Sequence, residues 1–444
     1  MENRLDLDFS KYIKLLNTSP VNKEVGKVTK VLGSRIEGYL PGACLGSTCS
    51  VSVGYDKHIL VEVVGLNDQR VVMMPYGDML GVKLGSSIKL IRSSATVKVG
   101  KGLLGRIIDA TGNPLDNKGP IVLIDELPLY STTVNPLERE PIRTPIDLGV
   151  KAINTFISVG RGQRMGIMAG SGVGKSVLLG MMARNTNADV NVIALIGERG
   201  REVKDFIEEI LGPEGLKKSV VIVATGDENP LVRSRGAFFA TAVAEYFANQ
   251  GQQVLLTMDS VTRFAMAMRE IGLSSGEPPA SKGYTPSVFS TLPKLLERAG
   301  SFTNGGSITG LYTVLVEGDD MDEPIADAVR SIVDGHIVLN RKLAHKAHFP
   351  AIDVLQSTSR VMKSVVQKDF YQVSLAVREL MAIYREAEDL IQIGAYQEGN
   401  NPRLDKAVEY NEKITQFLKQ DVDDNATFND SVDFLSSMQQ VINR

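Results

Sequence analysis

The glycine-rich stretch at residues 164–183, RMGIMAGSGVGKSVLLGMMA, holds residue types that bind phosphate. Arg164 to Met168 predicts a short buried strand, and the apolar run from Val177 predicts a helix. Between them, glycines let backbone N–H groups turn inward around phosphate oxygens, because a Cβ would block close approach. The helix N-terminus adds a partial positive charge. A glycine-rich turn with a chance lysine is the alternative, but the strand-to-helix setting favours a nucleoside triphosphate site.

The side chains of this phosphate loop have separate expected roles. Lys175 can reach the β and γ phosphates, and the Ser176 hydroxyl can ligate Mg²⁺. Ala169 stands where the strict pattern has its first glycine, and alanine is the smallest substitute. The residues expected to contact the nucleotide are Ala169, Gly170, Ser171, Gly172, Val173, Gly174, Lys175, Ser176 and Val177.

Asp259 ends the apolar run VLLTMD. A carboxylate at the end of a buried strand can hold the hydration shell of Mg²⁺ against Ser176. An aspartate in this position is also common at turns. Beside a phosphate loop, the metal role is the favoured interpretation.

Glu198 lies in IGERGRE, directly after the predicted strand at 190–196. The carboxyl ends of parallel strands converge on the ligand crevice, so this carboxylate can orient or deprotonate the attacking water. A salt bridge with Arg199, Arg201 or Lys204 is the alternative. Arg199 itself is a candidate for charge stabilisation or for ordinary pairing.

Three further features are weaker candidates when taken alone. Arg360, in QSTSRVM, could be delivered to a neighbouring subunit to neutralise charge on the γ-phosphate, or it could be a structural arginine. Phe349 could present an aromatic face to adenine or lie in a core. His345 and His348 form H-x-x-H without a third ligand, so no metal site is expected there.

The composition indicates a globular protein of two or three domains, because 444 residues exceed one ordinary core. The net charge of −3 gives no general reason to expect a nucleic acid partner. No apolar run is long enough for a transmembrane helix, and the N-terminal residues lack the apolar core of a signal peptide. Cys44 and Cys49 cannot form a disulfide framework or a zinc site by themselves. The cytoplasm is the expected location.

The predicted elements divide the chain into four parts. Residues 1–21 place apolar side chains at helical spacing and predict an amphipathic segment that packs on its own domain or binds a partner. Residues 22–97 hold short β-rich runs between turns, which predicts a small antiparallel β-barrel or sandwich. Residues 98–362 begin with a Gly- and Pro-rich connector and then alternate strand and helix, which predicts an α/β fold with a largely parallel sheet. Residues 363–444 predict a helical domain.

Several motifs occur in the order seen in the rotary-type ATPases. Besides the phosphate loop, they are GERGREV at 197–203, MDSVTRFAMAMREI at 258–271, GEPPASKGYTPSVF at 276–289, EGDDMDEPIAD at 317–327 and STSR at 357–360. The layout of barrel, nucleotide domain and helical domain is also similar. Within that superfamily the chain most closely resembles the flagellum-specific ATPases of type III protein export, notably in SGVGKSVLLGMMAR and GLLGRIIDATGNPLD. The resemblance covers nearly all of residues 25–440.

This resemblance implies a RecA-like nucleotide domain that binds ATP and Mg²⁺, and it implies a role for several residues. Glu198 matches the general base or water-positioning carboxylate, and Asp259 matches the metal-associated aspartate. Arg360 matches an arginine finger that acts on the adjoining subunit's nucleotide. Phe349 matches an adenine-contacting aromatic position. The glycine loop of this family also tolerates the alanine at position 169.

The resemblance further implies a partner set. The family forms a homohexameric ring with ATP sites between subunits, beneath a membrane export gate. Association with the membrane is therefore expected to be peripheral, at the cytoplasmic face of the inner membrane. Residues 1–21 are expected to bind a stator-like regulatory subunit, a central stalk-like protein is expected in the ring, and the C-terminal domain is expected to receive chaperone–substrate complexes. The implied function is ATP hydrolysis that promotes unfolding or delivery of flagellar proteins for export and flagellum assembly.

Three other functions remain open from the sequence. A subunit of a rotary ATP synthase would need a partner of different sequence. A ring-shaped RNA translocase should carry a basic, aromatic-bearing N-terminal module, whereas residues 22–97 contain no Trp and no Phe. A regulator that binds nucleotide without hydrolysing it would not need Glu198 beside the loop.

Overall fold

The computed structural model describes residues 25–54, 57–67, 70–131, 135–316, 318 and 320–442. Within it the chain divides into two compact units, with the division between Ala95 and Thr96. The amphipathic segment expected at residues 1–21 lies outside the described residues. Among the described helices, none combines the length and the apolar content that crossing a bilayer requires.

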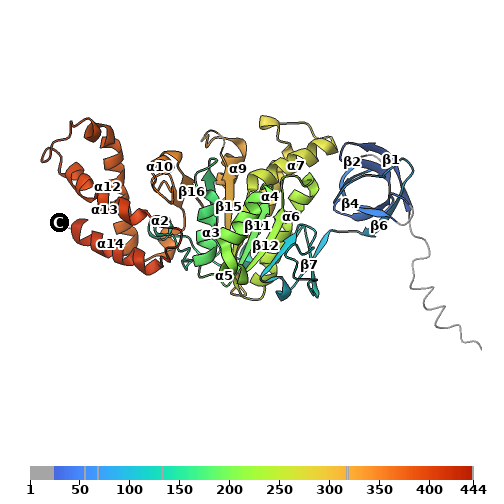
Figure 1. The fold of residues 1–444 in the computed structure, drawn as a ribbon, viewed down its shortest axis with the longest axis horizontal. Helices are drawn as coiled ribbons and strands as arrows, with labels where there is room; N and C mark the ends of the chain where they lie inside the picture. Colours follow the sequence, from blue (N-terminus) through green and yellow to red (C-terminus); the bar gives the residue numbers. More distant parts are fainter. Residues whose placement is uncertain are drawn as a thin grey trace, which may run out of the picture. The chain divides into compact units, whose positions relative to one another are not determined.

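The first unit is a closed antiparallel barrel with the strand order β1-β2-β5-β4-β3-β6 (Figure 1). Its strands are β1 (Val25–Leu32), β2 (Arg35–Tyr39), β3 (Thr48–Ser52), β4 (His58–Asn67), β5 (Arg70–Pro75) and β6 (Ser87–Arg92). Alternate side chains point inward, where Ile36, Val61 and Met73 are among those that form an apolar core. The predicted barrel is confirmed. Strand β2 was not predicted, because RIEGY contains a glutamate and a glycine that weaken the strand pattern.

The predicted Gly- and Pro-rich connector contributes strands to the second unit. Its elements are β7 (Thr96–Val99), η1 (Lys101–Leu103), β8 (Arg106–Asp109), β9 (Asp125–Pro128) and η2 (Pro136–Glu138). β7 and β9 form a two-stranded antiparallel ribbon, and β8 joins the main sheet parallel to β12. The connector is therefore an integral part of the α/β fold.

A largely parallel sheet forms the centre of the second unit, with the order β17-β16-β10-β15-β13-β11-β12-β8. Its other strands are β10 (Arg164–Ala169), β11 (Val190–Ile196), β12 (Ser219–Ala224), β13 (Gln253–Asp259), β14 (Gly300–Ser301), β15 (Ser307–Leu315), β16 (Gly335–Leu339) and β17 (Thr358–Ser359). Only the short strands β14 and β17 pair antiparallel with their neighbours in this sheet. The predicted α/β class is confirmed.

Helices cover both faces of this sheet (Figure 1). They are α2 (Lys151–Phe156), α3 (Lys175–Asn185), α4 (Gly200–Asp205), η3 (Phe206–Leu211), α5 (Gly212–Lys217), α6 (Pro230–Ala248), α7 (Val261–Ser275), η4 (Ser281–Gly283), α8 (Pro286–Leu296), α9 (Pro324–Ile332), α10 (Arg341–His345) and α11 (Met362–Val365). Helix α7 was not predicted as an element. The predicted helix at 201–211 is present, but its second half, η3, has π-helical hydrogen bonding.

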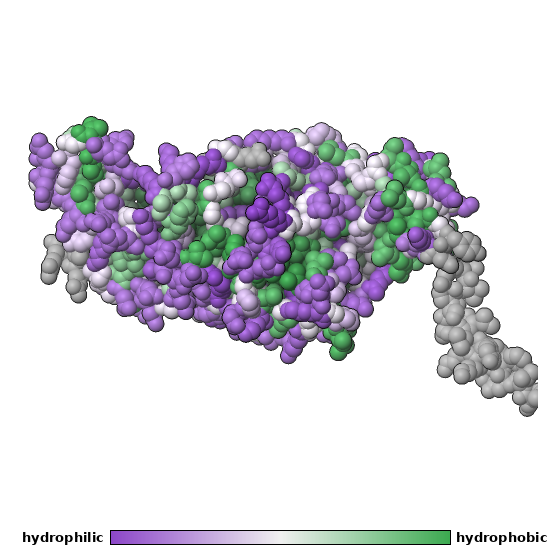
Figure 2. Space-filling view, in the orientation of Figure 1, coloured by the Kyte–Doolittle hydropathy of each residue, from purple (hydrophilic) through white to green (hydrophobic). Residues whose placement is uncertain are grey.

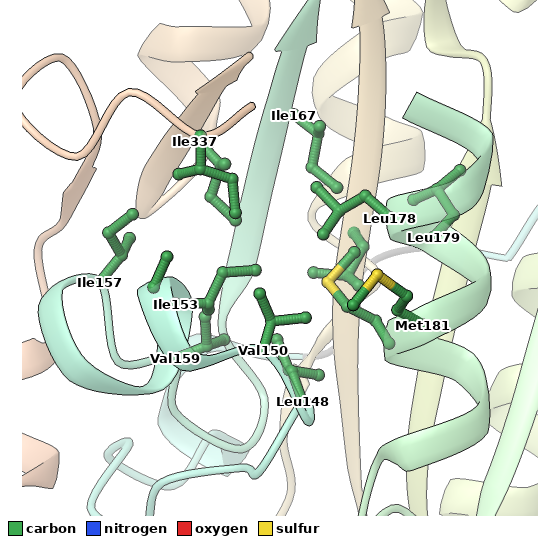
Figure 3. Close-up of a cluster of buried hydrophobic side chains, with 14 of the residues drawn as sticks. Leu148, Val150, Ile153, Ile157, Val159, Ile167, Leu178, Leu179, Met181 and Ile337 are labelled. Atoms are coloured by element: carbon green, nitrogen blue, oxygen red, sulfur yellow. The ribbon is translucent and has the colours of Figure 1, made fainter. Parts of the chain in front are cut away.

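The core beneath the phosphate loop orients helix α3 against strand β10. Leu178 and Met181 of α3 converge with Ile153 of α2 on Ile167 of β10 and Ile337 of β16 (Figure 3). All five side chains are almost fully buried. Each buried aliphatic side chain stabilises the fold by roughly 1.5–3 kcal/mol relative to an exposed one. The strand and the helix on either side of the loop are thus held by the same apolar cluster.

The helical region that follows packs on the nucleotide-binding part within the same unit. Its helices are α12 (Lys368–Gln392), α13 (Pro402–Leu418) and α14 (Phe428–Ile442). Phe417 of α13 and Phe434 of α14 are stacked with ring centroids 3.7 Å apart, and Phe434 also contacts Phe156 of α2 edge-on. The helical C-terminal region is confirmed, whereas the predicted domain boundaries at 97/98 and 362/363 stay predictions.

We expect a buried ion pair between α6 and the residue two positions after α8 to contribute strongly to stability. Both Nε and an Nη of Arg298 donate to the two carboxylate oxygens of Glu245 at 2.6 Å, and Arg298 has no exposed side-chain surface. Arg298→Met leaves Glu245 unpaired and should lower the free energy of unfolding by about 3–5 kcal/mol. Lys217→Met, which breaks an exposed pair with Glu214, is the control and should cost less than about 1 kcal/mol. Equal shifts of the thermal midpoint in both variants would contradict this expectation.

Candidate functional site

The phosphate loop lies between the carboxyl end of β10 and the first turn of α3. Gly172 and Gly174 have φ angles of 78° and 89°, in the left-handed region that favours glycine. Ala169 is instead the last residue of the strand, pairs in register with Leu315 and accepts a hydrogen bond from Val316 N–H. Its position requires no positive φ. This explains why alanine can replace the first glycine of the pattern.

The amino end of α3 faces the loop without a side-chain cap. Gly174 occupies the N-cap position, and no side chain there accepts a hydrogen bond from the first turn. The first helical hydrogen bond runs from Leu178 N–H to Gly174 C=O at 3.0 Å. The backbone N–H groups of Lys175, Ser176 and Val177 therefore have no helical acceptor, which is the arrangement that binds phosphate.

Lys175 lies between the two carboxylates that the sequence singled out. Its Nζ donates to Glu198 Oε1 at 3.3 Å and also bonds Asp259 Oδ1. The three side chains are only 11%, 15% and 3% exposed, respectively. Glu198 follows β11 and Asp259 ends β13, and these neighbouring strands are parallel. The sheet thus brings both carboxylates to the phosphate loop, as expected from their positions after strands.

Burial and mutual charge shift the protonation of this group. Burial, together with the charge of Asp259, raises the pKa of Glu198 to about 7, against the opposing effect of Lys175. Burial alone would lower the pKa of Lys175, but Asp259 and Glu198 together raise it. Lys175 is therefore charged at neutral pH, whereas Glu198 is close to half-protonated and can exchange a proton there.

A threonine that the sequence reading missed holds Asp259. Thr313 Oγ1, on β15, donates to Asp259 Oδ1 at 2.8 Å. Thr313 is fully buried on a strand adjacent to β13. Thr313 is one of three Ser and Thr residues in the strand SITGLYTVL, so the sequence does not indicate which of them meets Asp259.

Glu202 was also missed, although it extends the site. A hydrogen bond with Glu198 is the main cause of a lowered pKa at Glu202, and the same bond contributes to the raised pKa of Glu198. Arg199 is 83% exposed and donates to Glu202 Oε1 at 2.7 Å. The structure thus shows the pairing arrangement for Arg199, and its role in charge stabilisation stays a prediction.

Arg263 of α7 is a third residue that only the structure brings to the site. A Cβ on Gly197, the residue before Glu198, would lie 2.6 Å from the Cβ of Arg263, so glycine is required for this approach. Arg263 Nε is buried without a hydrogen-bond partner among the described residues. Arg263 is half-buried, and its Nη1 contacts Met266 Sδ, so a cationic side chain lies near Glu198.

Phe349 lies against the phosphate loop. A Cβ built on Gly174 would be 3.9 Å from Phe349 Cδ1, and the phenyl side chain is 47% exposed. The C=O of Phe349 accepts from the backbone N–H of Gln420, just after α13. The exposed ring therefore lies beside the loop, and its contact with adenine stays a prediction.

Arg360 lies at the amino ends of the parallel strands, whereas the phosphate loop lies at their carboxyl ends. Arg360 follows β17, and its backbone N–H donates to the C=O of Asp334, whose carboxylate pairs with Arg164 at the start of β10. The phosphate loop begins at the other end of β10, about 17 Å away for a six-residue strand. Within the part of the chain that the structure describes, the exposed guanidinium group has no ion pair or hydrogen bond. Arg360 is therefore too distant to serve the nucleotide of its own subunit.

The donor set at the loop fits Mg²⁺. Magnesium prefers oxygen ligands, keeps several waters and is commonly held by one or two protein groups together with substrate phosphates. The Ser176 hydroxyl and the buried Asp259 carboxylate supply those groups. Elsewhere, the described residues contain no group of three or more His, Cys, Asp or Glu arranged for a metal.

Comparisons with known families agree with this geometry. Residues 149–359 match the ATP synthase alpha/beta family, nucleotide-binding domain. Residues 366–437 match the T3SS EscN ATPase C-terminal domain. The first match contains the phosphate loop, Glu198 and Asp259, and the second covers most of helices α12 to α14.

Relatives and solved structures extend the likeness to nearly the whole chain. The flagellum-specific ATP synthase of Treponema pallidum (strain Nichols) is 52% identical over 429 residues, which cover 96% of each chain. The assembled ATPase EscN of the enteropathogenic E. coli type III secretion system has a TM-score of 0.88 at 44% identity, covering 93% of this chain and 99% of EscN. EscN in complex with its central stalk EscO has a TM-score of 0.86 at 43% identity, with the same coverage. With its phosphate loop, paired carboxylates and C-terminal helices, the chain belongs to the ATP synthase alpha/beta family, among the ATPases of flagellar and type III secretion export.

Proposed function

We propose that this ATPase hydrolyses Mg-ATP at the interfaces of a homohexameric ring and couples hydrolysis to the delivery or unfolding of flagellar proteins for export and flagellum assembly. One observation carries the proposal. Lys175, Glu198 and Asp259 meet at the carboxyl edge of the sheet, whereas Arg360 is exposed at the amino edge. Each copy would therefore supply most of its own ATP site and one residue, Arg360, of the ATP site of a neighbouring copy.

The residues of the loop have distinct tasks in hydrolysis. Lys175 leaves its carboxylate partners to bind the β and γ phosphates, whose charge attracts it. Glu198, with a pKa of about 7, orients the attacking water and accepts its proton. Backbone N–H groups at the start of α3 cradle the phosphate oxygens, and Phe349 contacts the adenine. Ser176 and Asp259 would hold Mg²⁺, which would supply positive charge to the phosphates.

The ring supplies the remaining positive charge. Arg360 of one subunit neutralises the charge that develops on the γ-phosphate bound by its neighbour. Assembly is supported by EscN, which is described as an assembled ATPase. The barrel also exposes large side chains, namely Leu32, Tyr39, Leu45, Leu60, Leu66, Leu80 and Leu84. Figure 2 shows several hydrophobic areas over the barrel. A second copy of the chain can bury such residues.

The proposed partners follow the same family. Because EscN binds a central stalk, EscO, we propose a stalk-like protein in the ring of this ATPase. Residues 1–21 are proposed to bind a stator-like regulatory subunit, and the C-terminal helices are proposed to receive chaperone–substrate complexes. The ring would lie at the cytoplasmic face of the inner membrane, in peripheral association with the export gate, and we propose no nucleic acid partner.

Glu198 should impose a pH dependence on turnover. A carboxylate accepts a proton only when ionised, so kcat/KM should fall about tenfold per unit as the pH drops below about 7. Glu198→Gln should abolish hydrolysis and retain nucleotide binding, whereas Lys175→Ala should weaken binding as well. Glu208→Gln, an exposed position in η3 paired with Lys204, is the control. Turnover at the original rate in Glu198→Gln would refute the assignment.

Arg360 should act only across a subunit interface. Arg360→Ala should bind nucleotide normally and lose the activity gained on assembly, by about 10³-fold or more. Mixing Arg360→Ala with Lys175→Ala should restore activity, because a Lys175→Ala copy supplies the arginine to an intact phosphate loop. Mixtures that stay inactive while still co-assembling, or full activity of Arg360→Ala alone, would rule out this role.

The export role can be tested in cells. Deletion of the gene should abolish flagellar filaments, and the original gene, but not Glu198→Gln, should restore them. Electron microscopy scores the filaments, and immunoblotting for the variant confirms equal protein levels. Normal filaments in the deletion strain would overturn the flagellar assignment.

A further inference from the structure

One segment of the second unit, Phe349 to Arg360, has a proposed nucleotide contact at each end. Phe349 lies at the chain's own phosphate loop. Arg360 lies at the amino ends of the parallel strands. In the proposed ring it contacts the nucleotide bound by the neighbouring copy. A movement of the whole segment would therefore affect both the nucleotide bound by the same copy and the nucleotide bound by its neighbour.

The centre of the segment is organised by a buried carboxylate. The side chain of Asp353 has no exposed surface. Its Oδ1 accepts from the backbone N–H groups of Leu355 at 3.1 Å and Gln356 at 3.2 Å, and its Oδ2 accepts from Asn340 Nδ2 at 2.9 Å. These bonds close a tight turn midway between Phe349 and Arg360.

The same turn is attached to strand β16. The N–H of Asp353 donates to the C=O of Val338 at 2.8 Å, and Val338 N–H donates to Ser357 Oγ at 2.9 Å. Ser357 Oγ donates in turn to the C=O of Asp353 at 2.6 Å. The segment thus behaves as one rigid piece, because its backbone and its buried polar side chains bond each other.

Two arginines of helix α12 hold this piece from the C-terminal side. Arg385 donates to Asp353 Oδ1 at 2.9 Å. Arg378, seven residues earlier and so on the same helix face, donates to the C=O of Ser357 at 3.0 Å and to the C=O of Phe156 at 3.3 Å. In the part of the chain that the structure describes, Arg385 is the only ion-pair partner of Asp353.

Apolar packing also joins α12 to the segment, because Ile352 and Val354 share a buried cluster with Val373 and Val377 of α12. Beside this cluster lies an open pocket of about 320 Å³, whose lining includes Ile352 and Val354 of the segment, Met381 and Tyr384 of α12, and Ile414 and Leu418 of α13. At this pocket α12 is not packed directly against the segment. There, the polar contacts at Asp353 and Ser357 add directional links between α12 and the segment.

We propose that Asp353 and Arg385 are positioning residues that make helix α12 control Phe349 and Arg360 together. A shift of α12 would change the contact of a subunit with its own adenine and the reach of its arginine to the neighbouring γ-phosphate in the same step. This inference rests on the proposed function, since it requires Arg360 to act in a neighbouring site. It adds a way in which the position of helix α12 affects the rate of ATP hydrolysis in the ring.

A double-mutant cycle tests the proposal in the full-length assembled protein. Arg385→Gln leaves Asp353 without a cation and should lower kcat about ten- to a hundredfold while weakening nucleotide binding several-fold. In an Arg360→Ala background, Arg385→Gln should lower kcat no further, because the residue through which it acts is already absent. Arg385→Lys, which keeps the charge, should restore most of the loss.

The control is Arg403→Gln, which breaks an exposed ion pair between α13 and Glu379 of α12 and should leave kcat and binding unchanged. Thermal unfolding and assembly of each variant are measured alongside. Multiplicative losses in the double variant, or an unchanged kcat in Arg385→Gln, would overturn the positioning role. Full activity of Arg360→Ala would instead refute the proposed finger, so the two failures are distinguishable.

Discussion

The site depends on burying one lysine beside two carboxylates. Lys175, Glu198 and Asp259 are all largely withdrawn from water, and unpaired charges in such a place would be very costly. The structure satisfies Lys175 with both carboxylates and leaves Glu198 half-protonated near neutral pH. Incoming phosphates compete for the same lysine. If Lys175 turned to the phosphates, the two carboxylates would lose their cation, and this is a physical argument for the proposed Mg²⁺ at the same place.

The direction of the strands then determines where the rest of the site must come from. Parallel strands place the phosphate loop, Glu198 and Asp259 at one edge of the sheet. Strand β17 runs antiparallel to β16, so Arg360, which follows it, lies at the amino ends of the parallel strands. No side-chain rotation can bridge the length of β10 between them. If Arg360 acts on a nucleotide, as proposed, that nucleotide must be bound by another copy of the chain; the assembled state of EscN supports this proposal.

Local pattern was sufficient to predict the loop and the two carboxylates, because each lies at the carboxyl end of a strand that is mainly apolar and buried. The strand at 190–196 was predicted with the bounds that the structure shows. Thr313, Glu202 and Arg263 were missed because tertiary contacts, and not spacing, define their roles. Helix α7 was not predicted because its sequence, VTRFAMAMREIGLSS, was interpreted as a motif, although its apolar residues recur at helical intervals.

The contact between Asp353 and Arg385 is equally invisible in the sequence, yet it follows from a simple constraint. The turn between Phe349 and Arg360 closes around a fully buried carboxylate, which hydrogen bonds and a cation both stabilise. Among the described residues, the only ion-pair partner of Asp353 comes from helix α12. Because this cation comes from helix α12, the position of that helix affects how well the turn is stabilised. In the proposed ring, the same contact would then also affect the alignment of Phe349 and Arg360.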